Sequence, residues 1–268
     1  MKNLMIYISP AKAFVNEDFN TGWQQETEIL AKVQIDNSLG LGWKKEDIWL
    51  VANFGYEYRG VKAMEIGDDT WCHFSPTASK LNAIVRLFEM GLIGDELYWF
   101  HDFDAFQLEP MHEGEVAIAD HEIGVTDYGR SSINPGRDLR WSTGTIFFKN
   151  GSLDLFQLWQ RETYKYKTNE EISLLETLKK GKYRHIKERV KKLNITYNLA
   201  TRRRLLAETY EMADKPLKVI HFLPFDKRPV EGEGENDNMA VCVHGKNRLN
   251  KVLVTPRLIE AFNEHGIS

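Results

Sequence analysis

Short, strongly apolar runs alternate along this chain with longer segments whose apolar residues recur at helical spacing. The runs are LMIYIS (4–9), DIWLVANF (47–54), ELYWFHD (96–102), EVAIAD (115–120), GTIFFK (144–149) and LKVIHFL (217–223). Several are apolar almost throughout, which is typical of strands covered on both faces. Strands that alternate with helices predict an α/β fold with a mostly parallel central sheet flanked by helices.

Three helices are expected between the runs, and each follows a residue whose side chain can cap a first turn. The candidate caps are Ser75 before the helix that opens with Pro76, Ser152 before 153–166 and Asn169 before 170–180. We find no internal repeat, and no linker divides the chain. The sequence therefore predicts a single domain over residues 1–268.

Composition and charge exclude several classes of protein. With 42% apolar and 28% charged residues, the chain has a globular composition. No run approaches eighteen consecutive apolar residues, so no membrane span is expected, and the apolar start before Pro10 is too short for a signal peptide. Cys72 and Cys242 form no CxxC pair, which indicates a reducing compartment and predicts a cytoplasmic protein. A net charge of −4 argues against a polyelectrolyte that binds nucleic acid throughout.

The most informative segment is LYWFHDFDAFQLEP (97–110), where an apolar strand leads directly into acidic residues. Ligands of open α/β sheets bind beyond the carboxyl ends of strands, and Asp102 and Asp104 are two residues apart at such an end. Extended backbone would point both to the same side. Two adjacent carboxylates repel each other unless a cation lies between them, and oxygen ligands suit Mg²⁺ or Mn²⁺. A solvated strand-end loop is the competing interpretation.

Asp102-Phe103-Asp104 resembles the DxD motif of nucleotide-sugar glycosyltransferases with the GT-A fold, in particular the glycogenin-like retaining transferases of glycosyltransferase family eight. Five further segments resemble that family in the same order along the chain. They are PTASKLNAIVRL with Lys80, Ser-Thr-Gly (142–144) before TIFFK, EEISLLETL (170–178), ITYNLATRR (195–203) and KVIHFLPFDKRP (218–229). The resemblance implies a GT-A, Rossmann-like sheet and a transferase that moves a hexose from a nucleoside diphosphate sugar to a hydroxyl acceptor.

The chain departs from the family pattern at two places. The Asp-Gln pair that opens the family's helix corresponds to Glu171-Ile172, which places the contacts to the acceptor or the leaving sugar in doubt. The glycine that follows His-Phe is replaced by Leu223-Pro224, so donor binding near Lys227 is expected to differ.

The resemblance also implies roles for individual residues. His221 becomes the third ligand, with Asp102 and Asp104, of a Mn²⁺ or Mg²⁺ ion that holds the donor diphosphate. On its own, a histidine that ends an apolar strand is more often structural. Lys80 and Lys227 are expected to contact phosphate or sugar, although a surface position is the usual place of a lysine.

Further candidates lie at the ends of other strands. Ile8 and Ser9, at the carboxyl end of the first strand, are expected to contact the nucleotide base and ribose. Ser142 and Gly144 correspond to the turn that holds donor and acceptor. Glu171 becomes a candidate catalytic or sugar-binding carboxylate, although acids are favoured in any first helical turn. Asp104 is the other candidate catalytic residue.

The run KKGKYRHIKERVKK (179–192) contains eight Lys or Arg residues and one Glu. Such a run is usually a solvated face, but basic residues interleaved with aromatic ones also bind polyanions. A polyanionic acceptor is therefore one possibility. Two other functions stay open: a nucleotidyltransferase, which the absence of glycine from SPAKAFVNED disfavours, and a non-catalytic transferase fold that binds a glycan or nucleic acid.

Overall fold

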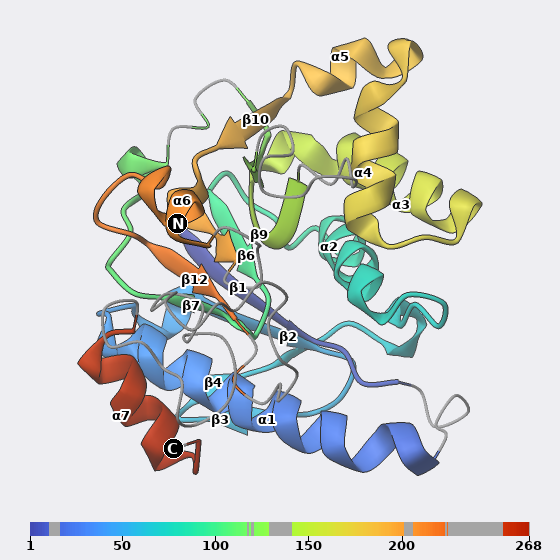
Figure 1. The fold of residues 1–268 in the computed structure, drawn as a ribbon. Coiled ribbons are helices and arrows are strands. Elements are labelled where there is room, and N and C mark those ends of the chain that lie inside the picture. Colours follow the sequence, from blue (N-terminus) through green and yellow to red (C-terminus); the bar gives the residue numbers. More distant parts are fainter. Residues whose placement is uncertain are drawn as a thin grey trace.

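The structure is a computed structural model that describes residues 1–10, 17–116, 118, 121–128, 141–200, 206–222, 224 and 254–267, with backbone only for 17–24 and 206–208. A seven-stranded sheet in the order β10-β8-β9-β6-β1-β2-β5 forms the centre (Figure 1). Its strands are β1 (Lys2–Tyr7), β2 (Ile48–Ala52), β5 (Met64–Glu65), β6 (Tyr98–His101), β8 (Ile123–Asp127), β9 (Trp141–Phe148) and β10 (Val190–Leu193).

Every neighbouring pair in this sheet is parallel except the two pairs that include β9, which runs antiparallel to β6 and β8. The predicted α/β fold with a mostly parallel sheet is therefore confirmed. Two smaller sheets complete the strands. They are β11 (Leu199–Ala200), β12 (Val219–His221) and β7 (Ala105–Gln107) in one sheet, and the hairpin of β3 (Glu57–Tyr58) and β4 (Val61–Lys62) in the other.

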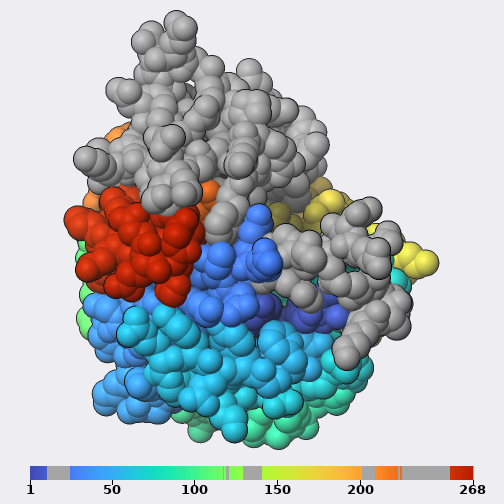
Figure 2. Space-filling view, turned by 90° about the horizontal axis from the view of Figure 1, so that it is seen from below, coloured from blue at the N-terminus to red at the C-terminus, as the bar shows by residue number. Residues whose placement is uncertain are grey.

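Helices cover both faces of the large sheet (Figure 1). They are α1 (Glu17–Gly40), α2 (Ser79–Glu89), α3 (Leu153–Tyr166), α4 (Glu170–Lys179), α5 (Arg184–Lys187), α6 (Leu206–Glu211) and α7 (Pro256–Glu264). One apolar cluster joins α2, α3 and α4 to one face of the sheet, and a second joins α1 to the other. Figure 2 shows α7, in red, packed beside α1, where Leu258 and Phe262 share a core with Leu30 and Val33. The described helices include none that is both long and apolar enough to cross a bilayer.

The helix caps agree only partly with the sequence prediction. Asn169 caps α4, because its side-chain oxygen accepts a hydrogen bond from the Ile172 amide. Ser152 caps nothing with its side chain; its hydroxyl donates to the Lys149 carbonyl instead. Ser75 precedes a single 3₁₀ turn, and α2 begins only at Ser79. Both serines therefore lie at the predicted boundaries without making the predicted bond.

The predicted strand at 115–120 is not formed by the residues of this run that the structure describes, which are Glu115, Val116 and Ile118. Glu115 ends a 3₁₀ turn, and the Ile118 amide bonds back to the Val116 carbonyl at 2.7 Å, a spacing that no extended strand allows. Val116 and Ile118 are nevertheless buried, against Trp99 and other residues of the sheet. Val116 and Ile118 are therefore apolar because they pack in the core, although they do not pair as a strand. The strand that follows them is β8.

The sequence analysis missed α1, the longest helix of the described part. The reason lies in its buried face, which carries Gln34, Asn37 and Ser38 at helical spacing among the apolar residues. These polar residues interrupt the amphipathic pattern by which helices are identified from sequence. What they do in the folded chain bears on the site.

Candidate functional site

The acidic pair occupies the connection between β6 and β7. The strand ends at His101, and the chain then turns so that the Ala105 amide donates to the Asp102 carbonyl at 3.0 Å. This is a turn rather than the predicted extended backbone. Asp102 and Asp104 nevertheless line the same cavity, whose volume is about 270 Å³. The predicted placement at a strand end is confirmed.

Backbone pairing brings His221 to this turn from more than a hundred residues away. β12 runs antiparallel to β7 with His221 opposite Ala105, and the Phe222 amide donates to the Asp104 carbonyl at 2.9 Å. The His221 imidazole Nε2 lies 3.0 Å from Asp104 Oδ1. One ligand atom from each of Asp102, Asp104 and His221 lies within 4.8 Å of the other two. Two carboxylates and one imidazole are a donor set that fits Mn²⁺ or Mg²⁺.

The two carboxylates have opposite protonation preferences. Burial and the neighbouring Asp104 charge raise the pKa of Asp102. Burial also opposes ionisation of Asp104, but the contact with His221 outweighs it and lowers the pKa of Asp104 below its usual range. The His221 pKa is raised in turn, because the Asp104 charge overcomes the burial of the ring. Burial and repulsion by Asp104 therefore disfavour the ionised form of Asp102, and a cation between the two carboxylates would offset both.

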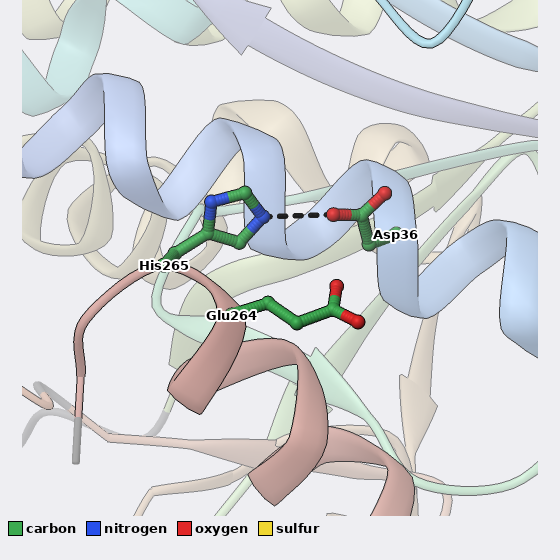
Figure 3. Close-up of side chains that lie close together, drawn as sticks. All are labelled: Asp36, Glu264 and His265. Atoms are coloured by element: carbon green, nitrogen blue, oxygen red, sulfur yellow. Dashed lines mark hydrogen bonds and ion pairs between the residues drawn. The ribbon is translucent and has the colours of Figure 1, made fainter.

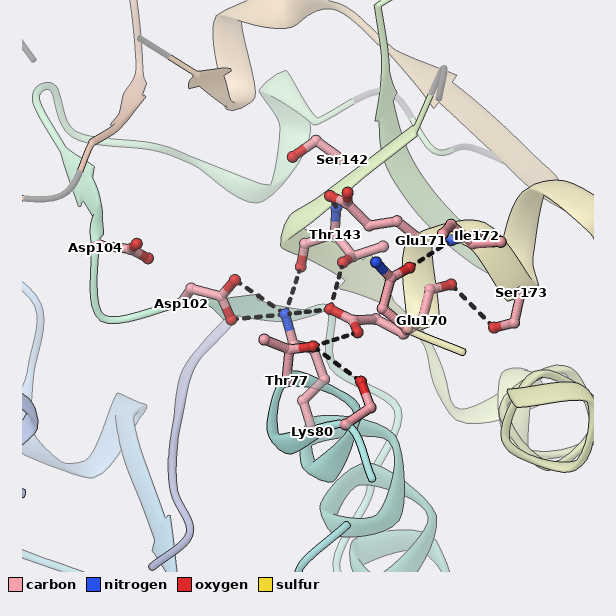
Figure 4. Close-up of polar contacts among 12 residues, drawn as sticks. Thr77, Lys80, Asp102, Asp104, Ser142, Thr143, Glu170, Glu171, Ile172 and Ser173 are labelled. Carbon is pink, nitrogen blue, oxygen red and sulfur yellow. Dashed lines mark hydrogen bonds and ion pairs between the residues drawn. The ribbon is translucent and has the colours of Figure 1, made fainter. Parts of the chain in front are cut away.

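Lys80 stands behind Asp102 as a buried counter-charge (Figure 4). Its Nζ lies 2.7 Å and 2.9 Å from the two Asp102 carboxylate oxygens and 3.2 Å from Glu170 Oε1. Burial alone would lower the pKa of the Lys80 ammonium, but these carboxylates raise it. Lys80 therefore stays charged and holds Asp102 toward the helix side of the cavity.

Glu170 is a site residue that the sequence analysis missed. Its carboxylate accepts hydrogen bonds from the Thr77 hydroxyl at 2.8 Å and from the Thr143 hydroxyl at 3.1 Å, besides the ion pair with Lys80. Burial would raise the pKa of Glu170, but Lys80 lowers it. A signal was present, because Glu170, Ser173 and Thr177 share the buried face of α4 at helical spacing.

Glu171, like Glu170, contacts Thr143 of β9, but it does so through the backbone amide. Its Oε1 accepts a hydrogen bond from the Thr143 backbone amide at 3.1 Å, and its side chain is half-buried. Ile172 is exposed to solvent and turns away (Figure 4). The residue paired with the Lys80 ammonium is therefore Glu170, and Glu171 follows it on α4.

Ser142 and Gly144 flank Thr143 on β9 and border the site. The Ser142 hydroxyl accepts from the Asn198 side-chain amide at 2.9 Å, and both residues are buried. The Gly144 carbonyl accepts from the Asp102 amide at 2.8 Å. A Cβ on Gly144 would lie 2.4 Å from two ring atoms of His221, so only glycine allows the imidazole to lie here.

The carboxyl end of β1 forms the opposite wall of the cavity. Ile8 lines the cavity together with Tyr7 and Phe103. The backbone of Ser9 pairs with one side chain instead, since its amide donates to Asn53 Oδ1 at 2.9 Å and its carbonyl accepts from Asn53 Nδ2 at 2.8 Å. Lys227, the remaining predicted contact, lies outside the described residues.

The basic run 179–192 spans the end of α4, α5 and β10. Five of its eight Lys and Arg residues form ion pairs with acidic residues. Arg189 is the most engaged, because it contacts both Glu122 and Asp154. The run is thus partly neutralised within the chain, and polyanion binding there stays a prediction.

A second cluster of two carboxylates and a histidine lies between α1 and α7 (Figure 3). His265 Nε2 lies 2.8 Å from Asp36 Oδ2, and Glu264 is nearby. Arg59 already supplies a cation here, with its guanidinium 2.9 Å from Asp36 and 3.9 Å from Glu264. The Tyr58 hydroxyl also donates to Asp36 at 2.9 Å. This arrangement fastens α7 and the β3–β4 hairpin to α1.

Comparison with known proteins gives a match at the level of structure only. No family model matches the chain, and no curated protein matches its sequence. The galactosyltransferase LgtC, solved with donor and acceptor sugar analogs, is 12% identical with a TM-score of 0.53, over 99% of this chain and 100% of that one. The bifunctional glycosyltransferase WbbM is 14% identical with a TM-score of 0.53, over 98% of this chain and 51% of that one.

The glycosyltransferase GlyE of Streptococcus pneumoniae TIGR4 is 13% identical with a TM-score of 0.50, over 100% of this chain and 64% of that one. At such identities the likeness establishes the fold. The chain therefore has the GT-A glycosyltransferase fold, with the resemblance to family eight that its sequence predicts. What the chain does with that fold has to be argued from its site.

Proposed function

We propose that this chain is a metal-dependent glycosyltransferase that moves a hexose from a nucleoside diphosphate sugar, with UDP-sugar as the first choice, to a hydroxyl of a glycan acceptor. The observation that carries the proposal is the meeting of Asp102, Asp104 and His221 beyond the strand ends, where the two aspartates line a cavity. Ligands of this class of sheet bind at that edge. The GT-A fold agrees with the proposal.

In the proposed reaction, the bond between the sugar C1 and the diphosphate oxygen breaks, and a new bond forms between C1 and the acceptor oxygen, whose proton passes to the leaving diphosphate. A bound Mn²⁺ or Mg²⁺ supplies charge stabilisation for the leaving diphosphate. Asp102, Asp104 and His221 would hold that ion. Lys80 keeps Asp102 oriented from behind through its contacts at 2.7 Å and 2.9 Å.

The acids of α4 have distinct proposed roles. The Glu170 carboxylate is already bound by Lys80, Thr77 and Thr143, so we assign it a structural role: it holds these three residues together. Glu171 accepts a hydrogen bond from the Thr143 amide, and its half-buried carboxylate is available to the sugar or to the acceptor hydroxyl. We assign the catalytic or sugar-binding role to Glu171. Retention of configuration is proposed from the family-eight resemblance.

Calorimetric titration tests the donor class. UDP, GDP, CMP and dTDP are each titrated into the protein with and without Mn²⁺, and we expect UDP to bind with a metal-dependent affinity. Absence of binding by every nucleotide with metal present would refute the proposal. A Glu171→Gln variant then separates its two roles, because loss of a sugar contact raises KM whereas loss of a catalytic carboxylate lowers kcat.

Two other functions are distinguished by simple measurements. A non-catalytic glycan-binding protein with this fold would not hydrolyse UDP-sugar, whereas a transferase releases sugar slowly to water. A nucleotidyltransferase would form pyrophosphate from a nucleoside triphosphate and a sugar phosphate. We expect slow UDP-sugar hydrolysis, since Asp102, Asp104 and His221 lie together as a cation site would require. We expect no pyrophosphate, since the segment SPAKAFVNED after the first strand contains no glycine.

A further inference from the structure

The buried polar face of α1 contacts the turn that carries the two aspartates. Gln34 is only 1% exposed, and its side-chain amide nitrogen lies 2.9 Å from the Phe103 carbonyl and 2.9 Å from the Ala105 carbonyl. An amide nitrogen has two N–H donors, so a single side chain satisfies both carbonyls. These carbonyls belong to the residues immediately before and after Asp104.

The remaining backbone bonds of the turn show why this contact matters. The Ala105 amide is tied to the Asp102 carbonyl, and the Phe222 amide is tied to the Asp104 carbonyl. Without Gln34, the Phe103 and Ala105 carbonyls would lose these buried donors, and the backbone on either side of Asp104 would be held less firmly. Buried carbonyls without a donor are unfavourable, so the turn would rearrange to find other partners.

We propose that Gln34 is a positioning residue, which holds Asp104 where its carboxylate meets Asp102 and His221. The residue touches neither cation nor substrate, and it acts only through the turn. The expected effect on metal binding rests on the proposed function. The two hydrogen bonds by which Gln34 holds the turn are independent of what the site binds. A residue that orients a ligand-bearing segment typically changes metal affinity by about 10- to 100-fold when it is removed.

Asn37 offers a matched control one turn further along α1. It is also buried, and its amide nitrogen donates to the Gln107 carbonyl at 2.9 Å, at the far end of β7 from the acidic pair. Replacing Asn37 therefore removes a buried amide–carbonyl bond between the same two elements. A purely structural role for Gln34 predicts equal effects of the two replacements on the site.

The experiment compares Gln34→Met and Asn37→Leu, each of nearly unchanged volume, with the wild-type protein. Titration with Mn²⁺ alone should show an affinity lower by about 10- to 100-fold in the Gln34 variant and within about threefold of wild type in the Asn37 variant. Hydrogen exchange, followed by mass spectrometry on a peptide spanning 102–107, should be faster in the Gln34 variant only. Unchanged exchange in the Gln34 variant would overturn the proposal, as would equal losses of Mn²⁺ affinity in both variants.

Two provisions keep the result decisive. If Gln34→Met does not fold, Gln34→Ser is used instead. The smaller serine leaves space in which water can donate to the Phe103 and Ala105 carbonyls. Where the wild-type protein binds no Mn²⁺, the proposed function fails, yet the exchange measurement on residues 102–107 still decides whether Gln34 holds the turn. The two failures are thereby distinguished.

Discussion

Two clusters in this molecule each combine two carboxylates with an imidazole, in very different settings. Asp102, Asp104 and His221 lie at a strand end beside a cavity, whereas Asp36, Glu264 and His265 lie between two helices. In the second cluster Arg59 bridges both acids, at 2.9 Å and 3.9 Å. In the first, Lys80 engages Asp102 from behind and leaves Asp104 paired with His221.

The composition of a cluster therefore does not make it a cation site. In both clusters the acids have basic partners, so what distinguishes them is what holds the carboxylates in place. The first cluster is fixed by backbone pairing of β7 with β12 and by a tight turn, while the second depends on long side chains that meet across helices. Groups held by backbone geometry keep their arrangement when a ligand arrives, which is what a binding site requires.

Removal of one carboxylate should give the largest contrast. Asp104→Asn keeps the shape of the side chain but removes one of the charges that neutralise the cation, so metal-dependent transfer should fall by about 1,000-fold. Asp36→Asn should leave transfer unchanged and lower only stability. Steady-state rates with Mn²⁺ and the thermal midpoints of both variants check this. Wild-type turnover by Asp104→Asn would place the metal elsewhere.

The two histidines provide the second contrast. His221→Ala should weaken UDP binding by about 10- to 100-fold when Mn²⁺ is present and change it little when Mn²⁺ is absent, because a metal ligand acts through the metal. His265→Ala should change neither affinity. Calorimetry with and without Mn²⁺ measures all four values. Equal losses for His221→Ala under both conditions would mean that the histidine is structural.

A third histidine, behind the first cluster, allows a test by pH. His101 is fully buried next to Asp102, and burial lowers its pKa to about 4 from an ordinary value near 6.5. Between these pH values the unfolded chain binds a proton that the folded chain does not, so the free energy of unfolding falls as pH falls. The expected loss from this group between pH 7.5 and 5 is about 2 kcal/mol.

Urea unfolding of metal-free wild-type protein and of His101→Gln, at pH 7.5 and pH 5, measures that loss. The variant should lack this component of the pH dependence, because glutamine does not titrate. His265→Gln serves as the control in the more open cluster. Parallel pH dependences for wild type and His101→Gln would contradict the buried, neutral state of His101.

A smaller effect is expected from one methyl group. Gly144→Ala places a Cβ where the His221 ring lies, 2.4 Å from two of its atoms, so the imidazole must move away from Asp104. We expect Mn²⁺ affinity to fall by about tenfold, less than on loss of the ligand itself. Gly114→Ala is the control, since an added Cβ there meets no atom within 4 Å. Equal Mn²⁺ affinities of the two variants would show that His221 does not depend on Gly144.

The smallest effect on transfer is expected from substitutions in the basic run 179–192. Its exposed ion pairs resemble the contacts of Asp36 and Glu264 more than those of Asp102 and Asp104. Lys182, Lys187 and Lys191 form no ion pair with the acids of the described residues. Their combined replacement by Glu should change the acceptor KM by less than about twofold at any salt concentration, as expected for solvated charges. A rise in KM that disappears with added salt would instead identify a polyanionic acceptor.

Local patterns gave much of this fold. Apolar runs located β1, β2, β6, β9 and β12, and the cap Asn169 located the start of α4. They failed at Val116 and Ile118, the apolar residues of the run 115–120 that the structure describes, which pack without pairing. They also failed at α1, where Gln34 and its buried polar neighbours hide a core helix. Local pattern cannot reveal such a helix, because its polar residues are satisfied by carbonyls some seventy positions away.

The same division applies to the site. From the sequence alone we predict that two aspartates end an apolar strand, that a histidine ends another, and that the order of motifs resembles a GT-A transferase. The folded chain adds that His221 meets Asp104, that Glu170 rather than Glu171 pairs with Lys80, and that Arg59 contacts both acids of the second cluster. The physical reason is that strand and helix propensities are local, whereas the position of a charge depends on which distant backbone segments pair.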